Sequence, residues 1–136
     1  IDGSIPLLPD MGICVTDVRD VAEAHVRALE APAQHVRGER FPTSEKFLWL
    51  REMAAIIRQR VPEHAGRVPR RGMPNWLVHM LAPFMDEMKQ VRGELGNVRD
   101  VSGRHTEEVL GFTFIAAEQT LEDTVRSLVA KGIVTH

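Results

Sequence analysis

The sequence feature that most constrains the fold is a short apolar run followed at once by a helical repeat. Residues Ile13 to Thr16 are apolar or β-branched and follow Gly12, which is typical of a short strand. Asp17 is then placed to cap a helix, and Asp20 stands at the positive end of the helix dipole. Pro32 limits how far this helix extends. A strand leading directly into a helix predicts an α/β fold.

The predicted helix carries many ionisable groups, which form either a reactive cluster or a solvated face. His25 lies two turns from Asp17 and Asp20, and a histidine near carboxylates is a common general-base arrangement. However, recurrence at three- and four-residue steps predicts a solvated stripe of Arg19, Glu23, Arg27 and Glu30. The same spacing predicts an apolar face of Val18, Val21, Ala22, Ala28 and Leu29. We therefore favour a capped helix over an active site.

Further strand and helix signals follow along the chain. Gly38 to Ser44 is predicted to be a strand with Pro42 near its edge, and the other candidate strands are Arg67 to Gly72 and Val98 to Val101. Helical spacing predicts helices over residues 49–61, over 102–110 with Gly111 after it, and over 118–131 with Gly132 after it. The order is strand, helix, strand, helix, and then mainly helices.

The segment from Asn75 to about Met88 is apolar on almost every side. Pro74 suits the first turn of a helix here, and Pro83 should kink or divide it. Its apolar residues are Trp76, Leu77, Val78, Met80, Leu81, Phe84, Met85 and Met88. Such a helix is expected in a core, or else at the surface of a partner contact or ligand site.

The composition is that of an ordinary globular protein. With 136 residues, one domain covering 1–136 is expected. The net charge of -2 gives no bias toward nucleic acid or an anionic membrane, and no apolar run is long enough to span a bilayer. A single cysteine, Cys14, suits a reducing cytoplasm. The sequence contains no tyrosine, so it cannot supply a phenol to any mechanism.

Other candidate sites are weaker. The histidines show no metal-binding spacing, so no metal is expected, and Ser102 near His105 is more simply a helix cap. Arginines that could bind a phosphate or carboxylate are Arg67, Arg70, Arg71, Arg92, Arg99 and Arg104. None of the ten glycines forms a G-x-G-x-x-G or G-x-x-x-x-G-K-[ST] loop. No cofactor-binding residue is therefore assigned to this chain.

Three segments of the chain are similar to sequence motifs of a single protein family, and they occur in the same order as in that family. Gly12 to His25 is similar to its strand and helix "V-D-V-R-D-V-A-x-A-H". Gly38 to Ser44 followed by Leu50 to Ala54 is similar to "G-E-R-F…S" and "L-R-E-[IL]-A". Val101 to Phe112 is similar to "V-S-N-x-K-A-R-x-L-G-F", with Gly103 where asparagine is usual. The chain thus resembles the C-terminal half of the extended short-chain dehydrogenase/reductases, in the NAD-dependent epimerase/dehydratase group close to dihydroflavonol reductase.

The resemblance implies a helix-rich α/β fold that is the C-terminal, substrate-binding portion of such an enzyme, with a few short strands. It also implies an N-terminal Rossmann half with G-x-x-G-x-x-G and a catalytic Y-x-x-x-K, neither of which occurs here. No catalytic residue can be transferred, because the tyrosine is absent. We expect the sequence to be part of a longer protein that binds NAD or NADP, and we expect this chain alone to bind neither cofactor.

The leading hypothesis is the substrate-binding portion of an NAD(P)-dependent oxidoreductase acting on a carbonyl or hydroxyl of a small organic molecule. By analogy, the expected pocket residues are Met11, Gly12, Arg70, Arg71, Trp76 and Met80. The alternative is a non-catalytic helical module for binding or oligomerisation. In both cases the apolar segment near Trp76 predicts self-association.

Overall fold

The computed structural model describes residues 7–134, so the first six residues and the last two, including His136, lie outside the described part. The strand and helix predicted first are present as β2 (Gly12–Val15) and α1 (Val18–Glu30). The Asp17 carboxylate accepts the Arg19 backbone N–H at 2.9 Å, which caps α1 as expected. A further short helix, α2 (Ala33–Val36), follows Pro32.

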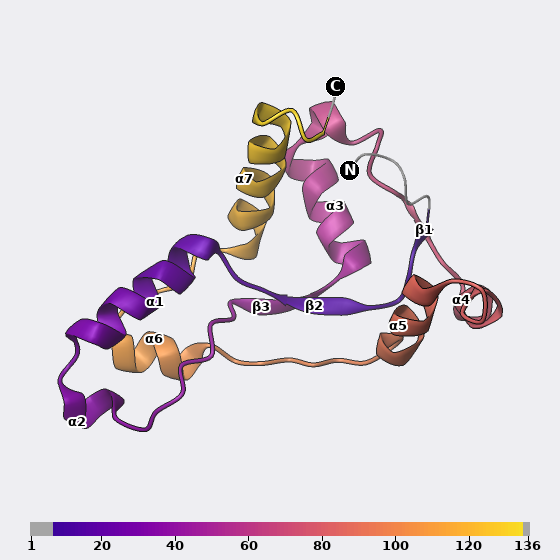
Figure 1. Cartoon of the computed structure of the whole chain (residues 1–136). Helices are drawn as coiled ribbons and strands as arrows, with labels where there is room; N and C mark the ends of the chain where they lie inside the picture. The colour runs from indigo at the N-terminus through magenta and orange to yellow at the C-terminus, as the bar shows by residue number, and fades with distance from the viewer. Residues whose placement is uncertain (1–6, 135–136) are drawn as a thin grey trace.

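Two small two-stranded sheets organise the chain. Strand β2 pairs antiparallel with β3 (Lys46–Trp49), so that Gly12 faces Trp49 and Val15 faces Lys46. Strands β1 (Leu7–Leu8) and β4 (Arg71–Gly72) pair in parallel. The candidate strand 67–72 is thus confirmed only in its last two residues. Figure 1 shows β2 and β3 as a central ribbon between two groups of helices.

The main core lies where α3 (Leu50–Arg60) packs against α7 (Ala117–Ala130) over the β2–β3 ribbon (Figure 1). Its buried residues are Val15, Leu48, Ala54, Ile57, Val61, Val68, Ala117, Leu121 and Val125. Helix α3 ends at Arg60, one residue before the predicted end, and a one-turn 3-10 helix, η1 (Pro62–His64), follows it. Burial of these apolar side chains is the main force holding the segments together.

The last helices end where the sequence indicated. Helix α6 (Arg104–Leu110) packs beside α1, and Gly111 follows it with a φ of 69°, a left-handed conformation that favours glycine. Helix α7 is closed by Gly132 in the same way. Within residues 7–134, none of the helices combines the length and apolar character that a membrane span requires.

Proline 83 divides the apolar segment, as predicted. Helix α4 (Asn75–Leu81) ends before it, and α5 (Asp86–Glu94) begins after it. Val78 and Ala82 are buried, but Trp76, Met80, Phe84 and Met85 are exposed. The expectation of a core helix is therefore only partly met, because one side of the segment is open to solvent.

Two predicted strands are wrong. Residues 38–44 form a loop, and the strand that pairs with β2 begins later, at Lys46. Pro42 has no backbone N–H to give to a sheet, whereas residues 46–49 are free to pair. Residues 98–101 are also irregular.

The buried face of α1 also differs from the prediction. Val18 and Leu29, assigned to the apolar face, are 79% and 87% exposed. The buried positions are instead Asp20 and Ala24. Asp20 is buried because its carboxylate accepts the backbone N–H of Ile115 at 2.9 Å, a partner 95 residues away. The polar stripe is confirmed at Arg19 and Glu23, which are exposed, whereas Arg27 is half-buried and donates hydrogen bonds to the carbonyls of Leu110 and Gly111.

Candidate functional site

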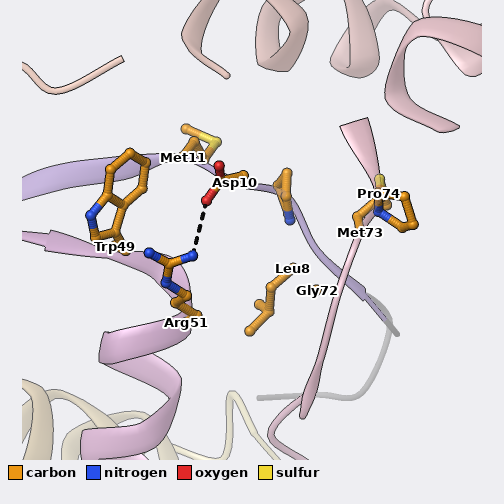
Figure 2. Close-up of a pocket in the computed structure, with 9 residues that line it drawn as sticks. Leu8, Asp10, Met11, Trp49, Arg51, Gly72, Met73 and Pro74 are labelled. Atoms are coloured by element: carbon orange, nitrogen blue, oxygen red, sulfur yellow. Dashed lines mark hydrogen bonds and ion pairs between the residues drawn. The ribbon is translucent and has the colours of Figure 1, made fainter. Parts of the chain in front are cut away.

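A pocket of about 310 Å³ lies beside the end of the β2–β3 ribbon. Its walls come from three parts of the chain, shown in Figure 2: residues 8–11 before β2, the junction of β3 and α3, and residues 72–74 before α4. The lining residues are Leu8, Pro9, Asp10, Met11, Trp49, Arg51, Gly72, Met73 and Pro74. The volume is at the lower end of the range for small-molecule sites.

Backbone hydrogen bonds hold these segments together. The N–H of Leu50 donates to the carbonyl of Met11 at 2.9 Å, which ties the first segment to the start of α3. The N–H of Met73 donates to the carbonyl of Leu8 at 2.6 Å, which ties the first segment to the third. The three segments therefore form a fixed frame, although they are distant in sequence.

Among the described lining residues, Asp10 and Arg51 are the ionisable ones. Nη1 of Arg51 lies 3.4 Å from Oδ1 of Asp10, as the dashed line in Figure 2 shows. The guanidinium carbon also lies 5.4 Å from the centre of the Trp49 ring, within cation–π range. The rest of the lining is mainly apolar, so the pocket suits a small ligand with an apolar body and a polar group near Arg51.

The chemistry available in this pocket is limited. Its lining holds no serine, threonine, cysteine, histidine, lysine or tyrosine that could act as a nucleophile or proton donor. It also holds no glycine-rich turn leading into a helix, which a nucleotide phosphate requires. The described lining therefore suits a small organic ligand and offers no turn that could hold a nucleotide phosphate.

Of the six pocket residues expected from the sequence, the described lining of this pocket includes one. Met11 lines it. Gly12 is the next residue, in β2, where an added Cβ would overlap the ring of Phe47. Arg70 and Arg71 are exposed just before the lining residue Gly72. Trp76 and Met80 are exposed on α4, which begins directly after Pro74.

Sequence reasoning missed Trp49 and Arg51 as pocket residues. Trp49 was placed inside a helix, and Arg51 on the solvent side of it. In the structure, Trp49 ends β3 and Arg51 stands in the first turn of α3. The available signal was the change from the apolar, aromatic-rich run Phe47–Trp49 to the helical repeat after it, because side chains at such a junction lie at a sheet end.

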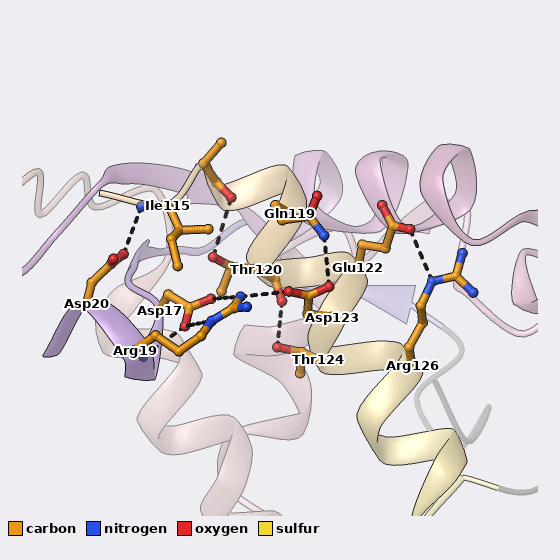
Figure 3. A network of polar contacts seen from close by, with 11 residues as sticks. Asp17, Arg19, Asp20, Ile115, Gln119, Thr120, Glu122, Asp123, Thr124 and Arg126 are labelled. Carbon is orange, nitrogen blue, oxygen red and sulfur yellow. Dashed lines mark hydrogen bonds and ion pairs between the residues drawn. The ribbon is translucent and has the colours of Figure 1, made fainter. Parts of the chain in front are cut away.

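A second polar region joins the start of α1 to α7 (Figure 3). Nη2 of Arg19 lies 2.7 Å from Oδ2 of Asp17 and 2.6 Å from Oδ2 of Asp123. A groove of about 490 Å³ runs beside these groups. The Arg19 hydrogen bonds hold the pKa of the Asp17 carboxyl far below its usual range, whereas burial raises the pKa of Asp20. The satisfied ion pairs give this region a structural role.

The other candidate catalytic groups are engaged in local contacts. Nδ1 of His25 lies 2.7 Å from the Val21 carbonyl of its own helix. Ser102 Oγ accepts the Arg104 N–H at 3.3 Å, but the N-cap position of α6 is Gly103, so the predicted cap is one residue too early. His105 stacks on Phe41. These contacts favour the structural interpretation of all three groups.

The fold and the pocket together define a class of protein. A helix-rich α/β chain with short strands and an apolar pocket is the arrangement expected for the substrate-side portion of an extended short-chain dehydrogenase/reductase. Comparison with known proteins confirms this resemblance, although no family model matches the chain.

The similar proteins are reductases. The chain is 32% identical over 131 residues to a ketoreductase (azaE) of Aspergillus niger, covering 96% of this chain and 32% of that protein. It is 27% identical over 113 residues to a protein named as an NADPH-dependent methylglyoxal reductase (GRP2) of Candida albicans, covering 83% of this chain and 28% of that protein. The chain thus spans about a third or less of the relatives it matches.

Solved structures show the same fold. The yeast methylglyoxal/isovaleraldehyde reductase Gre2, complexed with NADPH, matches 92% of this chain with a TM-score of 0.63 and 24% identity. This chain covers 36% of Gre2. A reductase engineered to attenuate substrate inhibition matches 89% of this chain with a TM-score of 0.58. The helix-rich α/β fold is therefore that of a part of these reductases.

Proposed function

We propose that this chain is the substrate-binding portion of an NADPH-dependent reductase that acts on a carbonyl group of a small organic molecule. The observation that carries the proposal is the apolar pocket formed by residues 8–11, 49–51 and 72–74. It lies within a chain that is similar along most of its length to ketoreductases and methylglyoxal reductases. Such a pocket would surround the organic part of the substrate.

The reduction itself requires groups that this chain does not supply. A hydride must reach the carbonyl carbon and a proton must reach its oxygen. NADPH would supply the hydride, but the described lining of the pocket has no glycine-rich turn for its phosphates, and the sequence has no tyrosine to give the proton. We therefore propose that a nucleotide-binding half binds NADPH and carries the proton donor, while this chain positions the substrate.

The pocket also has a proposed extension. Trp76 and Met80 lie on α4, which follows the lining residue Pro74, and both side chains are exposed. Arg70 and Arg71 are exposed at β4, on the other side of Gly72. We propose that these four residues border the substrate at the open side of the pocket, while Met11 and Gly12 bound it from β2.

The test is a titration of the purified chain with a neutral ketone, acetophenone, followed by nuclear magnetic resonance. The chain has two tryptophans, so the two indole N–H signals report separately on the pocket and on α4. We expect the Trp49 signal to shift in a saturable way. A shift of the Trp76 signal as well would support the extension onto α4. If neither signal moves at saturating ketone, the pocket is not a substrate site.

Variants sharpen this test. W49A should abolish ketone binding, because it removes the largest apolar wall of the pocket. Binding to this variant is followed through the signals of acetophenone, since the Trp49 reporter is absent. F84A is the matched control, since Phe84 is 84% exposed and does not line the pocket. The chain alone should not consume NADPH in the presence of ketone. Reduction of the ketone by the isolated chain would contradict the proposal that this chain only positions the substrate.

A second candidate function is a helical module for binding or self-association. The observation that favours it is the open apolar side of α4 and the turn after it, formed by Trp76, Met80, Phe84 and Met85. Such a patch is commonly an interaction surface. Sedimentation across a range of protein concentrations tests this function independently of any ketone.

A further inference from the structure

We infer that Arg51 makes the pocket selective for carbonyl compounds that carry a carboxylate. The inference rests on the proposed function, since it names the substrate class of the same pocket. It is carried by the geometry of Arg51, which stands in the first turn of α3 with its guanidinium at the pocket wall.

Most donors of the Arg51 guanidinium have no ion-pair partner among the described residues. The group has five N–H donors, and its one ion pair in this part of the chain is the 3.4 Å contact to Asp10. The other arginines of residues 7–134 that pair with carboxylates do so at 2.5 to 3.1 Å. The Arg51 side chain is also 66% exposed. Several donors are therefore available to a ligand.

The guanidinium is nevertheless held in place. Its carbon lies 5.4 Å from the Trp49 ring centre, and Asp10 holds it from the other side (Figure 2). An arginine held by a ring loses less conformational freedom when it binds a ligand, and its planar fork matches a carboxylate with two parallel hydrogen bonds. Arg51 is thus prepared to bind a planar anion.

The apolar walls of the pocket contact the part of the ligand that does not reach Arg51. Leu8, Met11, Met73 and Pro74 offer an apolar wall, and the Trp49 ring offers a flat one. Within residues 7–134, no second cation lines the pocket. A ligand that places a carboxylate on Arg51 and an apolar body against these walls therefore satisfies both parts of the site. A 2-oxo acid with an aromatic or branched side chain has this form.

Asp10 sets the strength of the preference. When the pocket is empty, its carboxylate occupies the position that an anionic ligand would approach, so it competes for Arg51. The competition is weak because the contact is long and both side chains are partly exposed. Removing the Asp10 charge should therefore strengthen binding of an anion and leave a neutral ligand almost unaffected.

The experiment compares two probes that differ in one charge, benzoylformate and its methyl ester. Each is titrated into the full chain at low ionic strength, and the Trp49 indole signal reports binding. We expect benzoylformate to bind roughly ten- to hundredfold more tightly than the ester, as charge-assisted hydrogen bonds allow. R51Q should remove this preference, R51K should keep part of it, and D10N should increase it.

The control is R126Q, because Arg126 also pairs with carboxylates but lies on α7 and does not line the pocket. It should leave the preference unchanged. Equal binding of the two probes, or a preference that survives R51Q, overturns the carboxylate inference while the pocket stands as a substrate site. If neither probe binds to the folded chain, the proposed function fails as well.

Discussion

Nη2 of Arg19 lies 2.6 Å from Oδ2 of Asp123, although the two residues are 104 positions apart. The same nitrogen lies 2.7 Å from the Asp17 carboxylate, which is buried at the start of α1 (Figure 3). Arg19 therefore connects the cap of one helix to the side of another. A residue that the sequence placed on a solvated stripe thus helps to fix how α1 sits against α7.

The first prediction concerns the order of destabilisation at this contact. R19Q should lower the melting temperature by several degrees, because the buried Asp17 carboxylate loses its strongest donors. D123N should lower it less, since Asp123 is partly exposed and Arg19 keeps its bonds to Asp17. Thermal unfolding of the variants measures both effects. R126Q is the control for loss of a surface arginine, and equal effects of R19Q and R126Q would contradict the prediction.

The second prediction is a loss of stability in acid that depends on Asp17. Its folded-state pKa lies far below the unfolded value of about 3.9, because Arg19 donates hydrogen bonds to the ionised form. The resulting stability is present above about pH 4 and is lost as the pH falls toward the folded pKa. D17N retains a good cap residue but cannot be protonated in this range. Urea unfolding at several pH values should therefore show a flatter acid limb for D17N than for the wild type.

The third prediction concerns Asp20, whose pKa is shifted in the opposite direction from that of Asp17. Burial raises the pKa of this carboxyl, so the ionised form is disfavoured in the folded state. The stabilisation linked to its proton is complete below about pH 3.9 and is lost as the pH rises through the folded pKa. D20N keeps an oxygen for the Ile115 N–H and carries no charge, so it should equal or exceed wild-type stability at pH 7. D20A leaves that N–H without its partner and should cost about 1–3 kcal/mol.

Urea unfolding at pH 7 and pH 3 checks this pair of variants. The gain of D20N over the wild type should shrink at the lower pH, where Asp20 itself becomes neutral. A D20N variant that is as unstable as D20A at pH 7 would show that the charge of Asp20, rather than its acceptor oxygen, supports the fold.

Local signals in the sequence were sufficient to place most helices. Asp17, Pro62 and Gly132 each mark a helix end, and each acts over only a few residues. Pro83 likewise divides α4 from α5 because it cannot donate the backbone hydrogen bond that a continuous helix needs. Helix ends that are set by residues so close in sequence can be predicted without knowledge of the rest of the chain.

Features that depend on distant partners were not predictable. The buried carboxylate of Asp20 accepts a hydrogen bond from the backbone N–H of Ile115, and no local sequence pattern predicts a partner 95 residues away. The strand at Lys46–Trp49 runs into α3 without a turn residue, so the helical repeat concealed it. The pocket was located through Met11, but Trp49 reaches it only because β3 pairs with β2 so that Trp49 faces Gly12.

The fourth prediction tests the packing at Gly12. An added Cβ there would lie 2.7 Å from the backbone oxygen of Leu48 as well as against the Phe47 ring, so the β2–β3 pairing would have to shift. G12A should therefore lower the free energy of unfolding by about 1–3 kcal/mol. G72A is the matched control, because a Cβ at Gly72 meets only the Leu8 oxygen, at 3.9 Å. Equal stability of G12A and the wild type in urea unfolding would show that the strands adjust freely.

The last prediction is that the exposed apolar residues near Pro83 cause self-association. Met80 and Phe84 are 52% and 84% exposed, and burying such side chains between copies is favourable. Sedimentation velocity should show concentration-dependent association of the wild type that M80E/F84E abolishes without loss of helix content. L29E tests the other exposed apolar surface, on α1, since Leu29 is similarly open. Association that survives M80E/F84E but not L29E would assign the contact to α1, and a wild type that stays monomeric at high concentration would contradict the prediction.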